Sequence, residues 1–573
     1  MSAPRSRPQP GSAPVTRRSA ILTLSVLGAA TLTGCSGLPR SGAVHRSDAV
    51  AVDESGLVQT APGPASGATP EQIVQGFLRA GEAGFSDDFV TAREFLIGPV
   101  REAWTPMGRV TVYRGSGGRT VSTAQDGTVE VTVDTMASLD ADGVLTQADG
   151  SAVRARYSLA TDASGEWRIV RLPGGLLVPD TALSDNFAPR SLYFLARDLR
   201  RLVPDLRWLP RRTGERRLVS ALLAGPAPWL APAVTSAVPR GLELADDGVV
   251  TSDGTARVTL SQEATALDAT HRSLLIAQIR ATLTQVDGLD SVTVTSAGDD
   301  LGEAAALPDP ARSPGALVGM SGGAVVRGAS STRTTLVTAD TLGTTEARWP
   351  ALGADGAVYA LSGASLLRVG AGATVATAVL SAETEDPSKI VMLPPVVDRH
   401  GWVWTAIDGA LTVVNAQGLR ARIDADWLTD DIELVDLSAE SERLAVRTRS
   451  GSSTSLRVAA VLRRADGVPI GLGDPVVLRP GSGVRAGLAW YDPTSLCLLA
   501  DPADGDGAPV LRRLQAPGTL SSSPGAQGAT TLVANRADGS VLLTDSSQQV
   551  WQRVGATWRV ISTDVTDVSY PLI

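Results

Sequence analysis

The sequence predicts a multidomain protein in which an α+β domain and an α/β domain are followed by an all-β propeller. Residues 69–188 begin with a helical hydrophobic period and continue as alternating strands. Residues 189–300 alternate strands with helices. From 314 to 573, short strands recur every 42 to 52 residues or so, which is the spacing of propeller blades. The chain has 573 residues, enough for several separate cores.

The first 34 residues have the order of a secretory signal peptide. Four arginines and no acidic residue precede an apolar core over residues 20–32. This core is shorter than the roughly 20 apolar residues that a membrane-spanning helix needs. The small residues before Cys35 are typical of a cleavage site, so we expect cleavage between Gly34 and Cys35.

The stretch "LTGC" at residues 32–35 resembles the bacterial lipobox, in which signal peptidase II cuts before a lipid-modified cysteine. The resemblance implies that Cys35 becomes the mature N-terminus and carries N-palmitoyl and S-diacylglycerol groups. Several acyl chains give stable anchoring, because each buried methylene contributes about 0.8 kcal/mol. The Arg-Arg pair at 17–18 leaves the export route open between the general and the twin-arginine pathways.

Charge and cysteine content exclude several function classes. The formal net charge is −9, and removal of the arginine-bearing leader makes the mature chain more acidic still, at about −13. Nucleic-acid binding is not expected, because phosphate contacts need clusters of Lys and Arg. The second cysteine, Cys497, lies in the apolar run "SLCLLA", where we expect a buried and inert thiol.

Residues 35–68 are predicted to form a flexible tether. Gly, Ser, Ala and Pro dominate this segment, and no hydrophobic period persists. A chain of this length and composition has a mean reach of about 30 Å. It would hold the folded part of the protein just off the membrane.

The first folded domain is predicted over residues 69–188. Thr69 and Pro70 have the pattern of a helix start, and Ile73, Val74, Phe77 and Leu78 form its apolar stripe. A second helix is expected in "FVTAREFLI". Strands are expected in "GRVTVYR", "GTVEVTVDTMASL", "SAVRARYSLAT" and "EWRIVRLP", with "DASG" as a hairpin turn. The order of these elements resembles an NTF2-like cone.

The second domain is predicted over residues 189–300. A strand is expected at 192–195, a helix ending at "AGP", the strand "ARVTLS", and a closing helix and strand. The last helix has an apolar stripe of Leu275, Ile279, Leu283 and Val286. The "LYFL" strand, the "LLAGP" helix end, the "AVPRGLEL" turn, "VTLS" and the closing pair resemble the GerMN domain of sporulation and spore-germination proteins. That resemblance assigns no catalytic residue.

The third domain follows a linker at residues 301–313. Five strand anchors are expected near Val358, Val403, Ala445, Cys497 and Leu542, which gives five to six blades, or seven if some are short. The ring could close by pairing the C-terminal "TDVSYPLI" with strands near "GAVVRGAS". Such closure leaves few open strand edges.

No catalytic residue, metal site or cofactor is predicted. His45, His271 and His400 stand singly, without a second ligand at metal-binding spacing, and are expected to be solvated loop residues. Ser321 in "GMSGG" matches a nucleophile motif by letters, but a β-branched segment follows it instead of the required helix. The acid clusters "DPADGDG" and "DDIELVD" lack a calcium-loop pattern, and we interpret them as surface turns.

Tryptophan is concentrated in the predicted propeller. Packing between blades explains most of these residues, while one or two at a loop rim could anchor a partner. Trp402 and Trp404 alternate along one strand and therefore share a face. The seven are Trp349, Trp402, Trp404, Trp427, Trp490, Trp551 and Trp558.

The lipobox, tether, NTF2-like unit, GerMN-like unit and propeller together resemble the actinobacterial lipoprotein LpqB family. The resemblance implies a membrane-anchored lipoprotein on the extracytoplasmic face. It also implies that the partner is the extracytoplasmic domain of a sensor histidine kinase like MtrB, in signalling tied to cell-wall homeostasis and division. The residues alone support a non-catalytic binding protein. Binding of a cell-wall polymer or small ligand, and an enzyme hidden in the propeller, remain alternatives.

Overall fold

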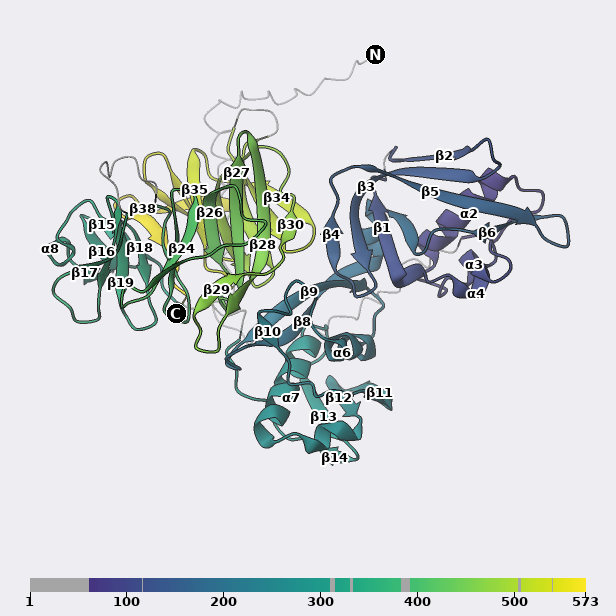
Figure 1. The fold of residues 1–573 in the computed structure, drawn as a ribbon, viewed down its shortest axis with the longest axis horizontal. Coiled ribbons are helices and arrows are strands. Elements are labelled where there is room, and N and C mark those ends of the chain that lie inside the picture. Colours follow the sequence, from purple (N-terminus) through teal and green to yellow (C-terminus); the bar gives the residue numbers. More distant parts are fainter. Residues whose placement is uncertain are drawn as a thin grey trace, which may run out of the picture. The chain divides into compact units, whose positions relative to one another are not determined.

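The computed structural model describes most of the chain after the predicted tether (Figure 1). The predicted cleavage and lipidation site at Gly34 and Cys35 lies outside the described residues. Within the described part, no helix is long and apolar enough to cross a membrane. The described residues are 61–115, 117–309, 315–329, 333–382, 392–502, 507–537 and 539–572.

The first domain opens with α2 (Pro70–Ala83), as predicted. The Thr69 side chain accepts a hydrogen bond from the Gln72 N–H, and the Gln72 side chain bonds back to Thr69, which completes a capping box. The predicted stripe of Ile73, Val74, Phe77 and Leu78 is buried. These contacts place α2 on the core side of the sheet.

The second predicted helix, over residues 89–97, is mostly wrong. Only α3 (Val90–Arg93) forms a helical turn there, and α4 (Val100–Ala103) follows separately. Leu96 makes a parallel bridge with Ile169, and the neighbouring Ile97 N–H donates to the Ile169 carbonyl. Pairing with the sheet therefore overrides the helical pattern of this segment.

The four strands predicted in the first domain are present. Among the described residues they belong to one sheet of seven strands. The main path runs β6-β5-β3-β1-β7, and β2 and β4 also pair with β3. The "DASG" hairpin between β5 and β6 is confirmed: the Asp162 carboxylate accepts from the N–H groups of Ser164 and Glu166. The elements are η1 (Pro106–Gly108), β1 (Arg109–Tyr113), β2 (Arg119–Thr123), β3 (Val129–Asp140), β4 (Leu145–Gln147), β5 (Ala152–Thr161), β6 (Trp167–Arg171) and β7 (Leu176–Pro179).

The second domain is an α/β unit with two small sheets. One has the order β10-β8-β9, and the other has the order β11-β12-β13-β14, in which β12 and β13 are parallel and α7 connects them. Helix α5 (Asp180–Asn186) precedes this domain and packs on the core of the first domain. The elements of the second domain are β8 (Phe187–Ala196), β9 (Leu202–Pro210), α6 (Glu215–Ala224), β10 (Val234–Thr235), β11 (Leu244–Ser252), β12 (Thr255–Leu260), η2 (Gln262–Ala266), α7 (Ala269–Leu283), β13 (Ser291–Ser296) and β14 (Asp299–Asp300).

Periodicity predicted the buried face of this domain. Leu275, Ile279 and Leu283 of α7 are fully buried, whereas Val286 lies beyond the helix end and is half-buried. Helix α6 ends at Gly225, whose φ of 105° favours glycine, as the "AGP" signal predicts.

The third domain is a β-propeller with six blades in the described residues (Figure 1). The first three blades are β15 (Val318–Ser321), β16 (Ala324–Arg327), β17 (Thr334–Val337) with β39 (Thr566–Ser569); β18 (Arg348–Leu352), β19 (Val358–Ser362), β20 (Ser365–Val369), β21 (Thr377–Ser381); and β22 (Val396–Val397), β23 (Val403–Ile407), β24 (Ala410–Val414), β25 (Arg420–Arg422). A short helix, α8 (Ala339–Leu342), precedes the second blade.

The other three blades complete the ring. They are β26 (Asp431–Leu437), β27 (Arg443–Ser450), β28 (Ser453–Arg463), β29 (Pro469–Leu472) with β30 (Val476–Leu478); β31 (Val484–Asp492), β32 (Ser495–Ala500), β33 (Val510–Gln515), β34 (Leu520–Pro524); and β35 (Ala529–Ala534), β36 (Val541–Asp545), β37 (Val550–Val554), β38 (Thr557–Ser562).

The predicted strand anchors and ring closure are confirmed. The five anchors lie in β19, β23, β27, β32 and β36, which are the second strands of five successive blades. The C-terminal strand β39 pairs with β15, so one blade combines the first and last strands of the domain. The ring therefore closes through non-local pairing.

Candidate functional site

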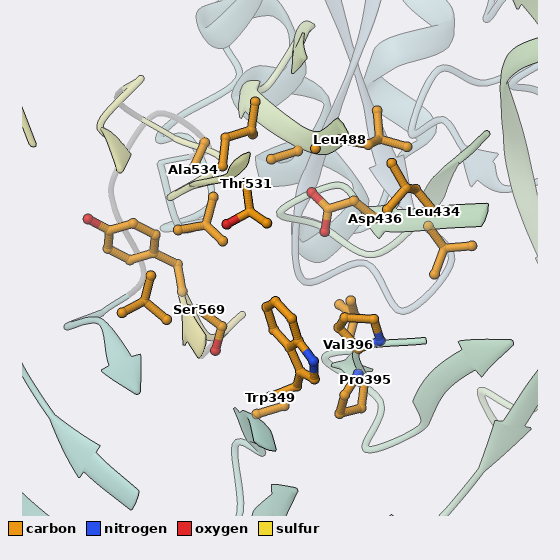
Figure 2. Close-up of a pocket in the computed structure, with 18 of the residues that line it drawn as sticks. Trp349, Pro395, Val396, Leu434, Asp436, Leu488, Thr531, Ala534 and Ser569 are labelled. Atoms are coloured by element: carbon orange, nitrogen blue, oxygen red, sulfur yellow. The ribbon is translucent and has the colours of Figure 1, made fainter. Parts of the chain in front are cut away.

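The innermost strands of the six blades (β18, β22, β26, β31, β35 and β39) surround a cavity of about 320 Å³ at the propeller centre (Figure 2). Most of the lining is apolar, and Figure 2 shows the Trp349 indole and the Asp436 carboxylate turned toward the open space. The lining comprises residues 349–352, 393–397, 434–436, 486–489, 531–534 and 568–572, together with Arg536. Every blade thus contributes to one site.

Trp349 reaches this cavity through an irregularity in its strand. The pairing of β18 with β19 shifts register between Arg348 and Ala351, and Trp349 has a φ of 54°. This left-handed conformation is unfavourable for a bulky side chain. Arg348 fixes the bulge from outside, since its Nε and Nη2 lie 3.0 and 2.9 Å from the carboxylate oxygens of buried Asp567. The bulge turns the indole toward the axis.

An ion pair forms another part of the cavity wall. Arg536 donates to the carboxylate of Asp436, with Nε 3.2 Å from Oδ1, and the Trp490 N–H lies 2.8 Å from Oδ2. Burial raises the pKa of Asp436, and the Arg536 guanidinium opposes that shift. Arg536 also donates to the carbonyls of Leu437 and Tyr570, which ties the segment after β39 to two blades.

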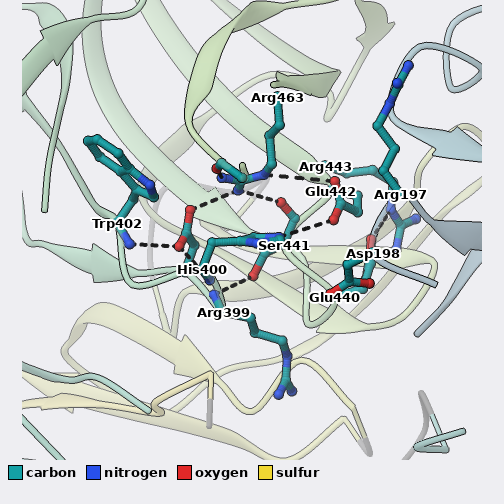
Figure 3. A network of polar contacts seen from close by, with 12 residues as sticks. Arg197, Asp198, Arg399, His400, Trp402, Glu440, Ser441, Glu442, Arg443 and Arg463 are labelled. Carbon is teal, nitrogen blue, oxygen red and sulfur yellow. Dashed lines mark hydrogen bonds and ion pairs between the residues drawn. The ribbon is translucent and has the colours of Figure 1, made fainter. Parts of the chain in front are cut away.

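A second buried polar network joins the third and fourth blades (Figure 3). Asp398, in the turn after β22, accepts hydrogen bonds of 2.8 to 2.9 Å from the N–H groups of His400 and Trp402, from the Trp404 indole and from Arg463. The Arg463 guanidinium lies over the Trp404 ring, 5.8 Å from its centroid. Asp398 thus gains four donors in compensation for the water it loses.

Arg443 joins the fourth and fifth blades while it pairs with Glu440 of its own blade. Arg443 is 1% exposed; its Nε lies 2.6 Å from Glu440 Oε1, and its Nη2 lies 2.7 Å from the Pro493 carbonyl oxygen. Its guanidinium also stacks on Trp490, 4.6 Å from the ring centroid. Nothing in the sequence indicates this network, because charged residues such as those in "DLSAESER" normally predict a solvated loop.

The histidines lie apart. His45 is outside the described residues. His271 is exposed, as expected, but the expected loop is wrong: it lies in the first turn of α7, and its ring bonds to the N-cap residue Asp268. His400 is in a turn, but its side chain is only 17% exposed and lies 3.5 Å from buried Glu442, so the expectation of a solvated residue is wrong. The turn packs against Gly467, which shields the ring.

Ser321 ends β15, and a tight turn leads directly into β16. The segment is therefore strand-turn-strand, which is not the strand-turn-helix of a nucleophile elbow. Cys497 is fully buried on β32, and burial raises the pKa of its thiol far above the usual range, in agreement with the predicted inert thiol.

The cluster "DDIELVD" was predicted to be a surface turn, and this is wrong, because Asp431–Leu437 form strand β26 and Asp436 is buried at the propeller centre. Glu433 pairs with Arg447 and Arg449, and Asp436 pairs with Arg536. Of the three acidic residues in "DPADGDG", Asp501 is the one among the described residues. No group of three or more potential metal ligands occurs in the part of the chain that the structure describes.

Three family models match successive parts of the chain. Residues 63–184 match the N-terminal domain of lipoprotein LpqB, residues 191–302 match the Germane domain of sporulation and spore germination, and residues 323–573 match the LpqB β-propeller domain. The NTF2-like character of the first domain stays a prediction.

Similar curated proteins share one name. The Lipoprotein LpqB of Bifidobacterium longum is 27% identical over 517 residues, which cover 86% of this chain and 87% of the relative. The Lipoprotein LpqB of Cutibacterium acnes is 30% identical over 52% of this chain and 48% of its own length. The Lipoprotein LpqB of Mycobacterium bovis is 29% identical over 46% of this chain and 46% of its own length. Several of these matches therefore span about half of the relative.

Similar solved structures include a nidogen/laminin complex, with a TM-score of 0.33 and 13% identity over 44% of this chain and 97% of the other. A catalytically inactive virginiamycin B lyase from Staphylococcus aureus has a TM-score of 0.30 and 8% identity over 42% and 78%. The three domain models match in order along the chain, and the curated relatives bear the name of a lipoprotein without an enzymatic term. The chain therefore belongs to the LpqB lipoprotein family.

Proposed function

We propose that this chain is a lipid-anchored lipoprotein on the extracytoplasmic face of the cell membrane that binds and modulates an MtrB-like sensor histidine kinase, in signalling linked to cell-wall homeostasis and division. The observation that carries the proposal is the LpqB domain order downstream of a lipobox-like sequence at residues 32–35. The lipid on Cys35 would supply the anchor, and residues 35–68 the tether.

We further propose that the protein acts by binding and not by catalysis. The buried charged groups at the propeller centre and between its blades are committed to one another, as in the pairs Asp436–Arg536 and Asp398–Arg463. A general acid or base must instead be free to exchange a proton with a substrate. This commitment favours a rigid scaffold that presents surfaces to a partner.

Anchoring gives this binding its mechanism. Confinement to the plane of the membrane raises the effective concentration of a neighbouring kinase ectodomain, so a weak contact suffices. If the lipoprotein binds one conformation of the ectodomain more tightly than the other, it shifts the kinase between its states and changes its output.

The test compares two forms of the chain in cells that lack the native gene. One form carries another lipoprotein's leader and retains Cys35. The other carries an ordinary cleavable leader with Cys35→Ala, and is exported without a lipid. At equal abundance, we expect the lipid-free form to lose most of its control over response-regulator phosphorylation. Equal control by both forms would contradict the role of the anchor.

Crosslinking in intact cells tests the partner itself. We expect the kinase among the captured proteins with the lipidated form, and much less with the lipid-free form. Absence of the kinase, with retention of the purified chain on isolated peptidoglycan, would instead support the cell-wall-polymer alternative. The small-ligand alternative has a specific observation in its favour, the cavity at the propeller centre.

A further inference from the structure

We propose that the cavity at the propeller centre binds an uncharged, largely apolar small molecule that packs on the Trp349 indole and accepts a hydrogen bond from it. This inference gives the small-ligand alternative a site and a ligand class. It rests on the propeller alone, so it stands or falls independently of kinase binding.

The conformation of Trp349 is the first argument. A left-handed backbone at a bulky residue costs on the order of 1–3 kcal/mol and persists only where the surrounding structure imposes it. Here the strand bulge and the Arg348–Asp567 ion pair hold the conformation. Its result is an indole that stands in the cavity and is only half-buried (Figure 2). Arg348 lies over the indole, 5.4 Å from the ring centroid, and the ring also packs against the apolar cluster of the second and third blades. The part of the indole that lines the cavity remains available to a ligand.

The indole N–H of Trp349 is the second argument. Within the described part of the chain it donates no hydrogen bond, and it is not among the fully buried polar atoms, so an acceptor from outside the protein can reach it. The other tryptophans that donate in this domain do so to fixed acceptors on the protein. These are Trp404, Trp427, Trp490, Trp551 and Trp558. The Trp402 indole donates to no described acceptor either, but Trp402 does not line this cavity. Trp349 therefore retains a donor for a ligand acceptor.

The lining determines the polarity of the ligand. Side chains such as Pro395, Val396, Leu434, Leu488 and Val533 supply an apolar wall from four different blades. Ser569 has its hydroxyl committed to the Pro350 carbonyl, 2.6 Å away. Ligand sites of this size are commonly apolar surfaces with a few polar groups that fix orientation.

The charges in the wall exclude an ionic ligand. The two charged lining residues, Asp436 and Arg536, pair with each other, and Arg536 uses its remaining contacts on backbone carbonyls. An ionised ligand would lose its hydration without gaining a free counter-charge, which is strongly unfavourable. The cavity thus selects neutral molecules.

Prodan is a suitable probe, because it has a neutral naphthalene body and a single ketone acceptor. We expect saturable binding of one Prodan per chain to the full mature chain carrying Cys35→Ala, with a blue-shifted Prodan emission and energy transfer from tryptophan. The anionic probe ANS should not compete. Trp349→Phe keeps the aromatic surface but removes the donor, and should weaken binding roughly two- to tenfold, the equivalent of one hydrogen bond.

Two further variants make the test decisive. Leu434→Trp fills the cavity and should abolish saturable binding, while Trp558→Phe, outside the cavity, should bind Prodan like the unmodified chain. Thermal unfolding of each variant confirms that it is folded. The proposal is overturned if the unmodified chain shows no saturable binding, or if folded Trp349→Phe and Leu434→Trp both bind as tightly as Trp558→Phe. If Leu434→Trp does not fold, the comparison of Prodan affinity between Trp349→Phe and Trp558→Phe decides the test alone.

Discussion

Two adjacent arginines offer a sharp test of the buried network. Arg463 and Asp398 are almost completely buried, with 3% and 0% of their side chains exposed and 2.8 Å between Arg463 Nη2 and Asp398 Oδ2. Arg464, the next residue, pairs with Asp466 at the surface, where both side chains are more than half exposed. Alanine at each position removes the same side chain from two very different environments.

We expect Arg463→Ala to destabilise the propeller by about 3–5 kcal/mol, because it leaves Asp398 buried without its counter-charge. For a domain of this size, that loss lowers the melting temperature by roughly 6–20 °C. Arg464→Ala should leave the melting temperature essentially unchanged, because exposed ion pairs contribute little. Tryptophan fluorescence during heating is a suitable readout, since seven of the 11 tryptophans lie in this domain.

A double variant separates charge pairing from loss of packing. Adding Asp398→Ala to Arg463→Ala should cost less than the sum of the two single changes, since neither charge then remains unpaired. If Arg463→Ala were as mild as Arg464→Ala, or if the two single effects simply added, the pair would not stabilise the junction of the third and fourth blades. The argument from burial would then be refuted.

Three other predictions concern single residues. Cys497 should resist DTNB at pH 8 in the folded Cys35→Ala chain and react fully in guanidinium, because burial raises the pKa of its thiol; rapid reaction of the folded chain would contradict this. Thr69→Ala should destabilise the first domain by about 0.5–2 kcal/mol through loss of the helix cap, with Thr69→Ser as the control that retains stability in urea unfolding. Burial, reinforced by the charge of Glu82, raises the pKa of Tyr113 to about 12, against about 10 in the unfolded chain. The contribution of Tyr113 to stability is therefore complete below pH 10 and is lost as the pH rises through 12. Tyr113→Phe should reduce this alkaline loss, measured as melting temperature against pH; an identical pH profile would count against it.

The second strands of the blades could be predicted because they are buried on both faces. Runs such as "VYALS" and "SLCLLA" are continuously apolar and flanked by turn residues, a pattern that single-sequence reasoning detects. The innermost strands, which line the central cavity, show no such continuous apolar run. The strand β22 has only two residues, and β18 is interrupted by the bulge at Trp349.

The candidate site was harder to predict than the fold. Composition identified tryptophan as informative, but the choice of Trp349 depends on a register shift that only the pairing of β18 with β19 reveals. The burial of Asp398, Glu440 and Arg443 was equally hidden, because it arises from contacts between blades. In the first domain, the bridge between Leu96 and Ile169 replaced a helix that local pattern favoured.

The pairing of β39 with β15 has a consequence for biogenesis. Residues more than 240 positions apart must meet before the first blade has all four strands. The ring therefore cannot close until β39 has been synthesised and is free to pair with β15. Until then, β15 presents an open edge to its neighbours, a hazard for misassembly. Loss of β39 (Thr566–Ser569) would leave that edge permanently bare.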